Sequence, residues 1–253
     1  MTRLEQTAAL VTGASSGIGE ATALALAAEG ARVAVVARRR DRLEDLAGRI
    51  GAAGGEALVV EADVTDEAAA RDAVAQAVAR FGRLDTVVAN AGVMLLGPIA
   101  DAPVEEWRRM VDLNVMGLLY TSHAAIPHLL AAAADGPRQV ADLVLVSSVA
   151  GRVARQGSGV YNLTKFGVGA FAESMRQEFT QRHLRTSLVE PGAVATELQS
   201  HLREEVRAAT MKRFEGMEKL EAEDIADAIS WIVTRGRRVA VNEVLIRPTE
   251  QPG

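Results

Sequence analysis

Seven short, continuously apolar segments recur along the chain, and a longer stretch with helical periodicity separates each from the next. The segments cover residues 8–13, 33–37, 57–60, 86–89, 142–148, 186–190 and 243–246. Strands that are apolar at every position are buried on both faces, as in a parallel sheet with helices on both sides. We therefore predict an α/β fold: a single Rossmann-type, doubly wound parallel sheet of about seven strands, with residues 1–253 forming one domain.

Composition excludes several classes of protein. None of the 253 residues is a cysteine, so the chain has no disulfide, no Cys-ligated zinc and no thiol nucleophile. The four histidines lack metal-ligand spacing with carboxylates, and we predict no metal site. The formal net charge of −5 argues against a general nucleic-acid surface.

The apolar segments also bear on where the protein resides. No apolar run approaches the roughly 18–20 residues that a membrane span needs. The N-terminal residues lead almost directly into a strand, without the apolar region and cleavage site of a signal peptide. We therefore expect a cytoplasmic protein that binds neither nucleic acid nor membrane.

A charged segment interrupts the alternation near the C-terminus. Residues 197–224 have helical propensity and stand where a short connection would suffice. Long insertions between sheet elements are often lids over a site, so we predict a substrate lid around residues 197–217. Its apolar members either face a substrate or pack onto the body of the protein, and they include Leu198, Leu202, Met211, Phe214 and Met217.

A glycine-rich turn, TGASSGIG, lies between the first predicted strand and the first predicted helix. Glycines there permit a tight turn and a close approach to a pyrophosphate, which the helix N-terminus attracts. The spacing is G-x-x-x-G-x-G rather than the commoner G-x-G-x-x-G, so the turn alone is weak evidence. The turn residues expected to bind a dinucleotide are Gly13, Ser15, Ser16, Gly17, Ile18 and Gly19.

The same letters also satisfy G-x-S-x-G, the nucleophile elbow of α/β-hydrolases. A serine hydrolase would use Ser15 with a histidine. Such an enzyme needs an upstream strand and loop for half of its oxyanion hole, and only a dozen residues precede the turn. The hydrolase is therefore the disfavoured alternative.

The end of the second predicted strand indicates which dinucleotide binds. An acidic residue there would bind the ribose 2′-hydroxyl of NAD, whereas arginine accommodates the 2′-phosphate of NADP. Ala37 occupies the expected acidic position, and Arg38, Arg39 and Arg40 follow it. Cations are poorly placed at a helix N-terminus, so we expect Arg38 and Arg39 to bind an anion and predict NADP(H) as the cofactor.

With further motifs in the same order, the chain resembles the short-chain dehydrogenase/reductase family over essentially its whole length. TGASSGIG is similar to the family's TGxxxGxG turn, and YNLTK, from Tyr161 to Lys165, is similar to its YxxxK motif. The resemblance also implies cofactor contacts from Asp63, Val64, Asn90, Ala91, Gly92, Tyr161, Lys165, Pro191, Gly192, Val194 and Thr196.

Within the family, the chain resembles an NADP-preferring branch of 3-hydroxy-acid (serine-type) dehydrogenases and clavaldehyde reductase. One departure is Glu20, where several NADP-preferring relatives place a basic residue. This departure leaves recognition of the 2′-phosphate to Arg38 and Arg39.

Tyr161 and Lys165 are four residues apart, so both lie on one face of a helix. Carbonyl reduction requires a hydride at carbon and a proton at oxygen, and Tyr161 can donate the proton. The pKa of a free phenol is about 10, and a neighbouring cation lowers it. We predict that Lys165 is that cation, aided by the positive nicotinamide of the oxidised cofactor.

Two more residues complete the predicted catalytic set. Ser148 ends the fifth predicted strand, where its hydroxyl can hydrogen-bond the substrate oxygen. By resemblance, Asn114 anchors a water that links Lys165 to solvent.

These observations predict an NADP(H)-dependent oxidoreductase that interconverts a ketone or aldehyde and its alcohol, with Tyr161 as general acid/base. The resemblance implies a homotetramer or homodimer. Besides the hydrolase, one alternative is a non-catalytic module that senses NADP without turning it over.

Overall fold

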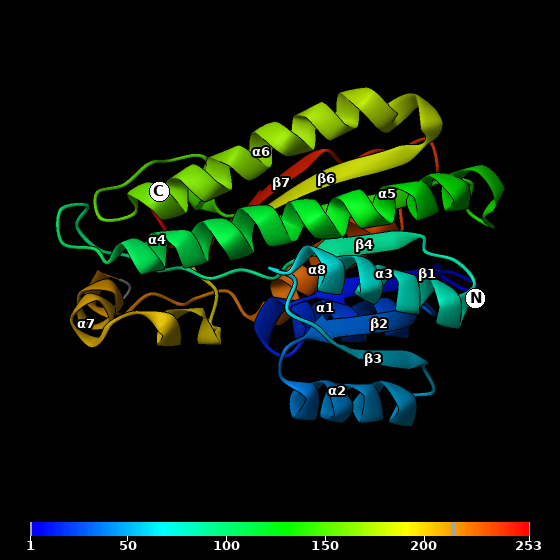
Figure 1. Ribbon diagram of the computed structural model, residues 1–253, viewed down its shortest axis with the longest axis horizontal. Coiled ribbons are helices and arrows are strands. Elements are labelled where there is room, and N and C mark those ends of the chain that lie inside the picture. Colours follow the sequence, from blue (N-terminus) through cyan, green and yellow to red (C-terminus); the bar gives the residue numbers. More distant parts are fainter. Residues whose placement is uncertain (1, 214–215, 253) are drawn as a thin grey trace.

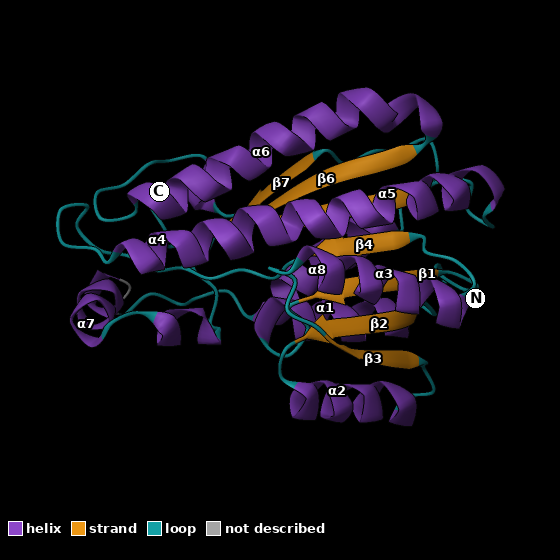
Figure 2. Cartoon of the chain, viewed as in Figure 1, coloured by secondary structure: helices purple, strands orange, loops and turns teal. Residues whose placement is uncertain are grey.

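Seven parallel strands form one sheet in the computed structural model, which describes residues 2–213 and 216–252. Their order is β3-β2-β1-β4-β5-β6-β7, and the orange arrows of Figure 2 show most of these strands side by side. The strands are β1 (Ala8–Thr12), β2 (Arg32–Ala37), β3 (Ala57–Glu61), β4 (Thr86–Ala89), β5 (Ala141–Val146), β6 (Leu184–Pro191) and β7 (Glu243–Ile246). The predicted sheet of parallel strands is confirmed.

Helices cover both faces of this sheet (Figure 1). The α-helices are α1 (Gly17–Ala28), α2 (Arg40–Ala52), α3 (Glu67–Phe81), α4 (Val104–Val111), α5 (Leu118–Asp135), α6 (Gly159–Phe179), α7 (Glu204–Arg213) and α8 (Ala222–Val233). Successive side chains of a strand point to opposite faces. In β1, Leu10 accordingly packs in the core beneath α3, α5 and α6, whereas Val11 packs beneath α1, α2 and α8.

One continuous helical stretch departs from our expectation about membrane spans. Residues 104–135, which include a π-helical segment (Asp112–Gly117) between α4 and α5, are long and apolar enough by composition to cross a membrane. However, Leu118, Ala125 and Leu129 of α5 are buried in the core against the sheet. The apolar character of this stretch therefore reflects packing against β4 and β5.

The strand order reverses direction between β1 and β4. The chain proceeds from β1 to β2 and β3 on one side, then returns to place β4 beside β1. At such a switch point the connections leave the carboxyl ends of neighbouring strands in opposite directions, and a crevice opens between them. The loops that follow the strands and carry predicted site residues all lie at the carboxyl ends of the strands, where this crevice opens.

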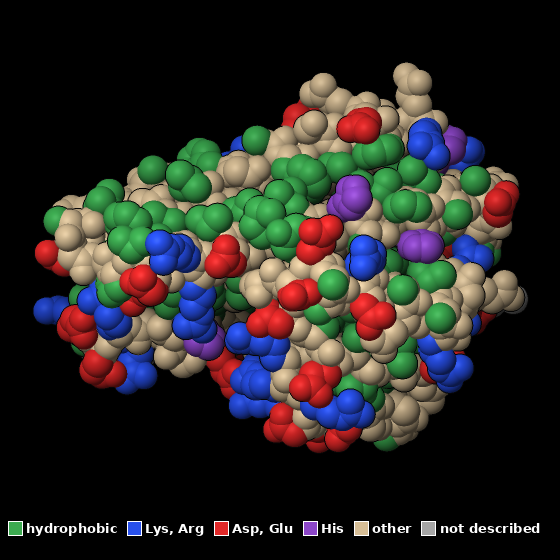
Figure 3. All heavy atoms as spheres, in the orientation of Figure 1, with side chains coloured by type: hydrophobic (Ala, Val, Ile, Leu, Met, Phe, Trp, Pro, Cys, Tyr) green, Lys and Arg blue, Asp and Glu red, His purple; other side chains and the backbone are tan. Residues whose placement is uncertain are grey.

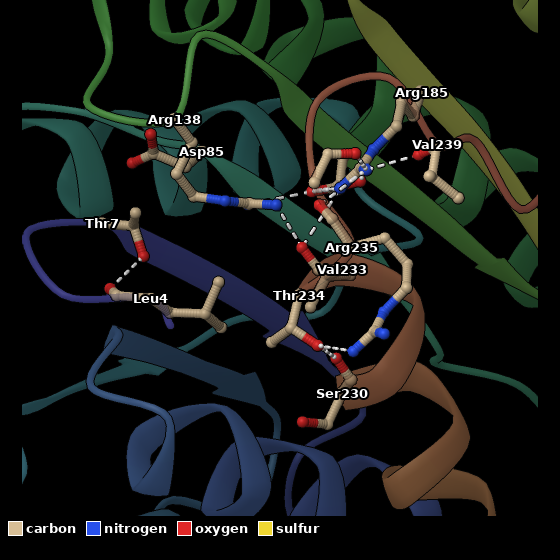
Figure 4. A network of polar contacts seen from close by, with 12 residues as sticks. Leu4, Thr7, Asp85, Arg138, Arg185, Ser230, Val233, Thr234, Arg235 and Val239 are labelled. Carbon is tan, nitrogen blue, oxygen red and sulfur yellow. Dashed lines mark hydrogen bonds and ion pairs between the residues drawn. The ribbon is translucent and has the colours of Figure 1, made fainter. Parts of the chain in front are cut away.

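The opposite edge holds a buried ionic network (Figure 4). Asp142 of β5 is fully buried and accepts two hydrogen bonds from Arg185 of β6, at 2.7 and 2.9 Å, and one from Arg138 at 3.1 Å. Arg185 also donates to the carbonyl of Val233, the last residue of α8, at 3.1 Å. Cations are favourable at a helix C-terminus, so the network ties α8 to the centre of the sheet.

We expect Asp142→Ala to lower the free energy of unfolding by about 3–5 kcal/mol, because it leaves a buried guanidinium without its partner. Urea denaturation monitored by circular dichroism measures the change. Glu173→Ala removes an exposed partner of Arg176 and should change stability far less, because solvent screens exposed ion pairs. Equal effects of the two substitutions would contradict a stabilising role for the network.

Candidate active site

The carboxyl ends of the strands open into a cleft of about 350 Å³. Nearly all of the residues predicted to bind cofactor or act in catalysis line it. The two exceptions support its wall: Gly19 packs against Gly13, and Asn114 hydrogen-bonds Val93. The structure therefore brings together residues that are up to 183 positions apart, from Gly13 to Thr196.

The turn after β1 requires glycine at specific positions. Gly13 has a φ of +66°, and a Cβ atom there would lie 2.9 Å from the Cα of Ala91. Gly17 has a φ of +54°, and a Cβ atom there would lie 3.0 Å from Thr196. The turn thus packs closely against the loops after β4 and β6, which leaves its backbone facing the cleft.

Thr12 and Asn90 hold the turn to the loop after β4. The Oγ1 of Thr12 accepts hydrogen bonds from the backbone N–H groups of Asn90, at 3.0 Å, and Ala91, at 3.1 Å. The Nδ2 of Asn90 donates in return to the carbonyl of Thr12 at 3.0 Å. Asn90 lines the cleft, and these bonds show that it fixes the geometry of the switch point; its contact with a cofactor stays a prediction.

Tyr161 lies in the first turn of α6, beside Ser148 at the end of β5. The phenol is buried, and burial raises its pKa, while a hydrogen bond with Ser148 acts to lower it. The Oγ of Ser148 accepts a hydrogen bond from the N–H of Ala150 at 3.1 Å and lies 3.4 Å from the carbonyl oxygen of Pro191. The two hydroxyls therefore face one point in the cleft.

Lys165 lies one turn after Tyr161 on α6, with its Nζ 5.9 Å from the centre of the tyrosine ring. The ammonium group is buried and donates to the carbonyl of Val146 at 3.0 Å. Burial lowers the pKa of Lys165 to about 8. The predicted pairing on one helix face is present, but burial dominates the pKa of Tyr161 in place of the expected effect of Lys165.

Asn114 lies in the π-helical segment, within a local widening of the helix rather than in the regular helix we expected. Such segments are frequent at functional sites. Its side chain pairs with the backbone of Val93 in both directions at 2.8 Å, and its Nδ2 donates to Thr164 at 3.3 Å. A Cβ atom on Gly92 would lie 3.3 Å from the Oδ1 of Asn114 and 3.7 Å from the Nζ of Lys165. Asn114 is thereby fixed beside Lys165.

The basic end of the cleft lies around the start of α2. Arg38 pairs with Asp63 at 3.6 Å. Arg39 donates to the hydroxyls of Ser15, at 3.0 Å, and Ser16, at 2.8 Å. Of the two arginines that we expected to bind an anion, Arg39 thus lies at the glycine-rich turn with two hydroxyl groups beside it, whereas Arg38 pairs with Asp63 after β3.

The predicted lid comprises a short 3₁₀ segment (Glu197–His201) followed by α7. We expected the apolar side chains of the lid either to face a substrate or to pack onto the body of the protein. Leu198 lines the cleft, whereas Leu202 is buried without lining it. Met217 is half-buried. The side chain of Met211 and all of Phe214 lie outside the described residues.

Four residues of this region were not predicted from the sequence. Thr12 locks the switch point, and the hydroxyl of Ser147 donates to the carbonyl of Lys165 at 3.0 Å. Glu197 and His201 line the cleft from the 3₁₀ segment at the start of the predicted lid. Burial, followed by the positive charge of Arg109, lowers the pKa of His201. The position of Glu197 directly after the PGAVAT stretch was the available signal.

Ser15 is not arranged as a hydrolytic nucleophile. Its Oγ accepts hydrogen bonds from Arg39, which cannot take up a proton. Within residues 2–213 and 216–252, no histidine hydrogen-bonds Ser15. The surroundings of Ser15 suit anion binding rather than nucleophilic attack.

Comparison with known proteins identifies the family. The family pattern described as short chain dehydrogenase matches residues 7–207. The chain belongs to the short-chain dehydrogenase family. An uncharacterized oxidoreductase of Listeria innocua is 34% identical over 245 residues, which cover 96% of each protein.

Two other relatives extend this comparison. Glycine betaine reductase of Emericella nidulans is 39% identical over 247 residues; these cover 96% of the present chain but only 19% of that longer protein. A serine dehydrogenase solved as a closed complex with NADP⁺ superimposes with a TM-score of 0.88 at 28% identity, covering 98% of this chain and 97% of the other.

The buried Lys165 gives this short-chain dehydrogenase a testable pH dependence. Its folded-state pKa of about 8 lies below the ordinary value of 10.5, so the folded state binds fewer protons between these values. The buried ammonium of Lys165 therefore lowers the free energy of unfolding by its full amount below pH 8, and this loss of stability is relieved as the pH rises towards 10.5. The difference between the two pKa values corresponds to roughly 3 kcal/mol in the free energy of unfolding.

We expect Lys165→Met to raise the free energy of unfolding at pH 7 by about 1–3 kcal/mol, since the lost bond to Val146 offsets part of the gain. At pH 10 the gain should largely vanish. Urea denaturation at both pH values measures it, with the exposed Lys212→Met as control. A loss of stability at pH 7 would show that the ammonium stabilises the fold.

Proposed function

We propose that the protein is an NADP(H)-dependent oxidoreductase that interconverts a ketone or aldehyde and the corresponding alcohol. One observation carries the proposal: Tyr161, Ser148 and Lys165 converge at one end of a cleft whose other end presents Arg38, Arg39 and a glycine-rich turn. A nicotinamide at the first end and an adenosine phosphate at the second fit this arrangement. An NADP-sensing module would have no need of the catalytic end.

The cleft also fits the cofactor in its shape. Gly13 packs against the backbone of Ala91, and Gly92 packs against Asn114 and Lys165, so the loops that line the cleft lie close together. When bound, the cofactor supplies or accepts the hydride. The turn from Gly13 to Gly19 would hold the pyrophosphate through N–H groups at the start of α1, and the stretch from Pro191 to Thr196 would hold the nicotinamide half of the cofactor.

The protein residues handle the proton. Ser148 hydrogen-bonds the carbonyl oxygen and orients it towards Tyr161, which donates a proton to that oxygen as negative charge develops. Lys165 would hold the nicotinamide ribose, and it places positive charge near the phenol, which favours the phenolate in the reverse reaction. Asn114 positions a water through which Lys165 exchanges protons with solvent.

The substrate end of the cleft is partly apolar. Val93, Met94 and Leu198 line it, so we propose a moderately apolar carbonyl compound, with 3-hydroxy acids as one class to examine. A panel of ketones, aldehydes and hydroxy acids, followed by NADPH absorbance, tests the class. We also propose a cytoplasmic location, which fractionation with an antibody would test.

We expect Tyr161→Phe to lower kcat by about 10²–10⁴-fold, because the variant lacks the proton donor, while NADPH binding stays nearly intact. The matched control is Tyr120→Phe, which changes the other tyrosine of the chain and should keep its activity. If Tyr161→Phe retained more than a few per cent of activity, the assigned role would be wrong. An esterase activity that Ser15→Ala removes would instead support the hydrolase.

Cofactor preference follows from the basic end of the cleft. If both Arg38 and Arg39 bind the 2′-phosphate, kcat/KM should favour NADPH over NADH by about two orders of magnitude, since a hydrogen bond to a charged group contributes roughly 1.5–3 kcal/mol. The double variant Ala37→Asp, Arg38→Ala should weaken NADPH and improve NADH. Arg40→Ala, which removes the partner of Glu44, serves as control. Comparable wild-type values for the two cofactors would contradict the assignment.

We also propose a homo-oligomer, a homotetramer or homodimer, formed through α5 and α6. Figure 3 shows apolar side chains gathered over α4, α5 and α6. On α6, Leu163 is 63% exposed and Phe166 is 45% exposed. Large exposed apolar patches mark interaction surfaces, and a second copy of the same face would bury them.

Light scattering should therefore give a mass of at least twice 26.8 kDa for the wild type. Leu163→Glu combined with Phe166→Glu should reduce it, because each charge would be buried without a partner. Val239→Glu changes an exposed apolar residue outside α5 and α6 and should leave the mass unchanged. A monomeric wild type would exclude the interface.

A further inference from the structure

Glu197, the first residue of the lid, lies between two arginines of the basic end. Its carboxylate accepts a hydrogen bond from Arg39 at 2.8 Å and another from Arg42, in the first turn of α2, at 2.7 Å. These bonds hold the pKa of Glu197 down at about 2, so the carboxylate is charged at every physiological pH. The lid thus places a permanent anion on the arginines.

The position that this carboxylate occupies has the features of an anion site. Arg39 also contacts the hydroxyls of Ser15 and Ser16, which belong to the glycine-rich turn. A guanidinium flanked by two hydroxyls offers several donors in one direction, which is the arrangement that a phosphate requires. Glu197 supplies one carboxylate to these donors, where a phosphate would supply three oxygens.

Glu197 is mechanically linked to the rest of the lid. Thr196 caps the 3₁₀ segment and packs on Gly17, so the lid begins directly on the turn. A single β-bridge between Val194 and Leu220 joins the chain just before the lid to the chain just after it. A change at Glu197 therefore acts on the first turn of the lid, at its point of attachment.

We propose that Glu197, held by Arg42, competes with the adenosine 2′-phosphate of NADP(H) for Arg39, and so couples recognition of this cofactor to the position of the lid. The inference rests on the proposed function, because it assigns a 2′-phosphate to the basic end. Binding of NADP(H) displaces the carboxylate and frees the first turn of the lid. NAD(H) has no 2′-phosphate, and it leaves the Glu197 contacts in place.

Competition of this kind has a distinct energetic signature. The apparent affinity for a ligand falls by the fraction of molecules whose site is free. Glu197 therefore reduces the apparent affinity for NADPH, whose 2′-phosphate needs the arginine, and not that for NADH. Removing the carboxylate should therefore tighten NADPH and leave NADH unchanged.

Fluorescence titration of NADPH and NADH into wild type and Glu197→Gln measures the effect. We expect the Kd for NADPH to fall about three- to tenfold, the range for two half-exposed ion pairs, and the Kd for NADH to change less than about twofold. Glu204→Gln removes the same charge from α7, where Glu204 pairs with Arg207, and should change neither value. An unchanged or raised Kd for NADPH in Glu197→Gln would overturn the proposal.

A double-mutant cycle separates competition for the arginines from general repulsion between Glu197 and the phosphate. In an Arg39→Ala, Arg42→Ala background, competition predicts that Glu197→Gln changes the Kd for NADPH by less than about twofold. An undiminished effect in that background would overturn the proposal, because repulsion does not need the arginines.

The same titrations distinguish failure of this inference from failure of the proposed function. If the two arginine substitutions weaken NADPH but not NADH, the 2′-phosphate site is present, and the Glu197 result alone decides the inference. If they weaken neither cofactor, the assignment of the basic end is wrong, and the inference fails with it.

Discussion

The geometry of the cleft depends on the hydrogen bonds between Thr12 and the loop after β4. A parallel sheet whose strand order reverses must bring two loops together at the reversal, and buried N–H groups there need acceptors. The Oγ1 of Thr12 provides one for both Asn90 and Ala91, and Asn90 returns a bond to the backbone of Thr12. These bonds hold the turn from Gly13 to Gly19 against the stretch from Asn90 to Gly92, and both segments line the cleft.

Burial of the Lys165 ammonium opposes stability at neutral pH, and the ionic network at the amino ends of the strands supports it. Burial disfavours the charged forms of both Tyr161 and Lys165, as expected where an active site tunes its acids and bases. At the other edge, Asp142 and Arg185 are buried as well but satisfy each other and the end of α8. One sheet thus carries an unfavourably buried ammonium at the carboxyl ends of its strands and a satisfied ionic network at their amino ends.

Strands and motif positions were predictable because they follow from local pattern. The apolar runs located all seven strands to within two residues, and the glycine-rich turn and Tyr161–Lys165 spacing located both ends of the cleft. Contacts between distant segments were not predictable in the same way. The pairing of Glu197 with Arg39 joins residues 158 positions apart, and no local pattern encodes it. The burial that dominates the pKa of Tyr161 likewise depends on the tertiary fold, as does the π-helical position of Asn114.

The most direct test of the account follows the hydride. NADPH carrying deuterium at the transferring position of C4 should be incubated with the best carbonyl substrate, and the product alcohol analysed by mass spectrometry and NMR. The account predicts one deuterium on the carbinol carbon and none lost to solvent, with the hydroxyl proton drawn from water through Tyr161. Deuterium that appears in water, or a carbonyl panel that gives no deuterated alcohol while NADPH binds, would contradict hydride transfer in this cleft.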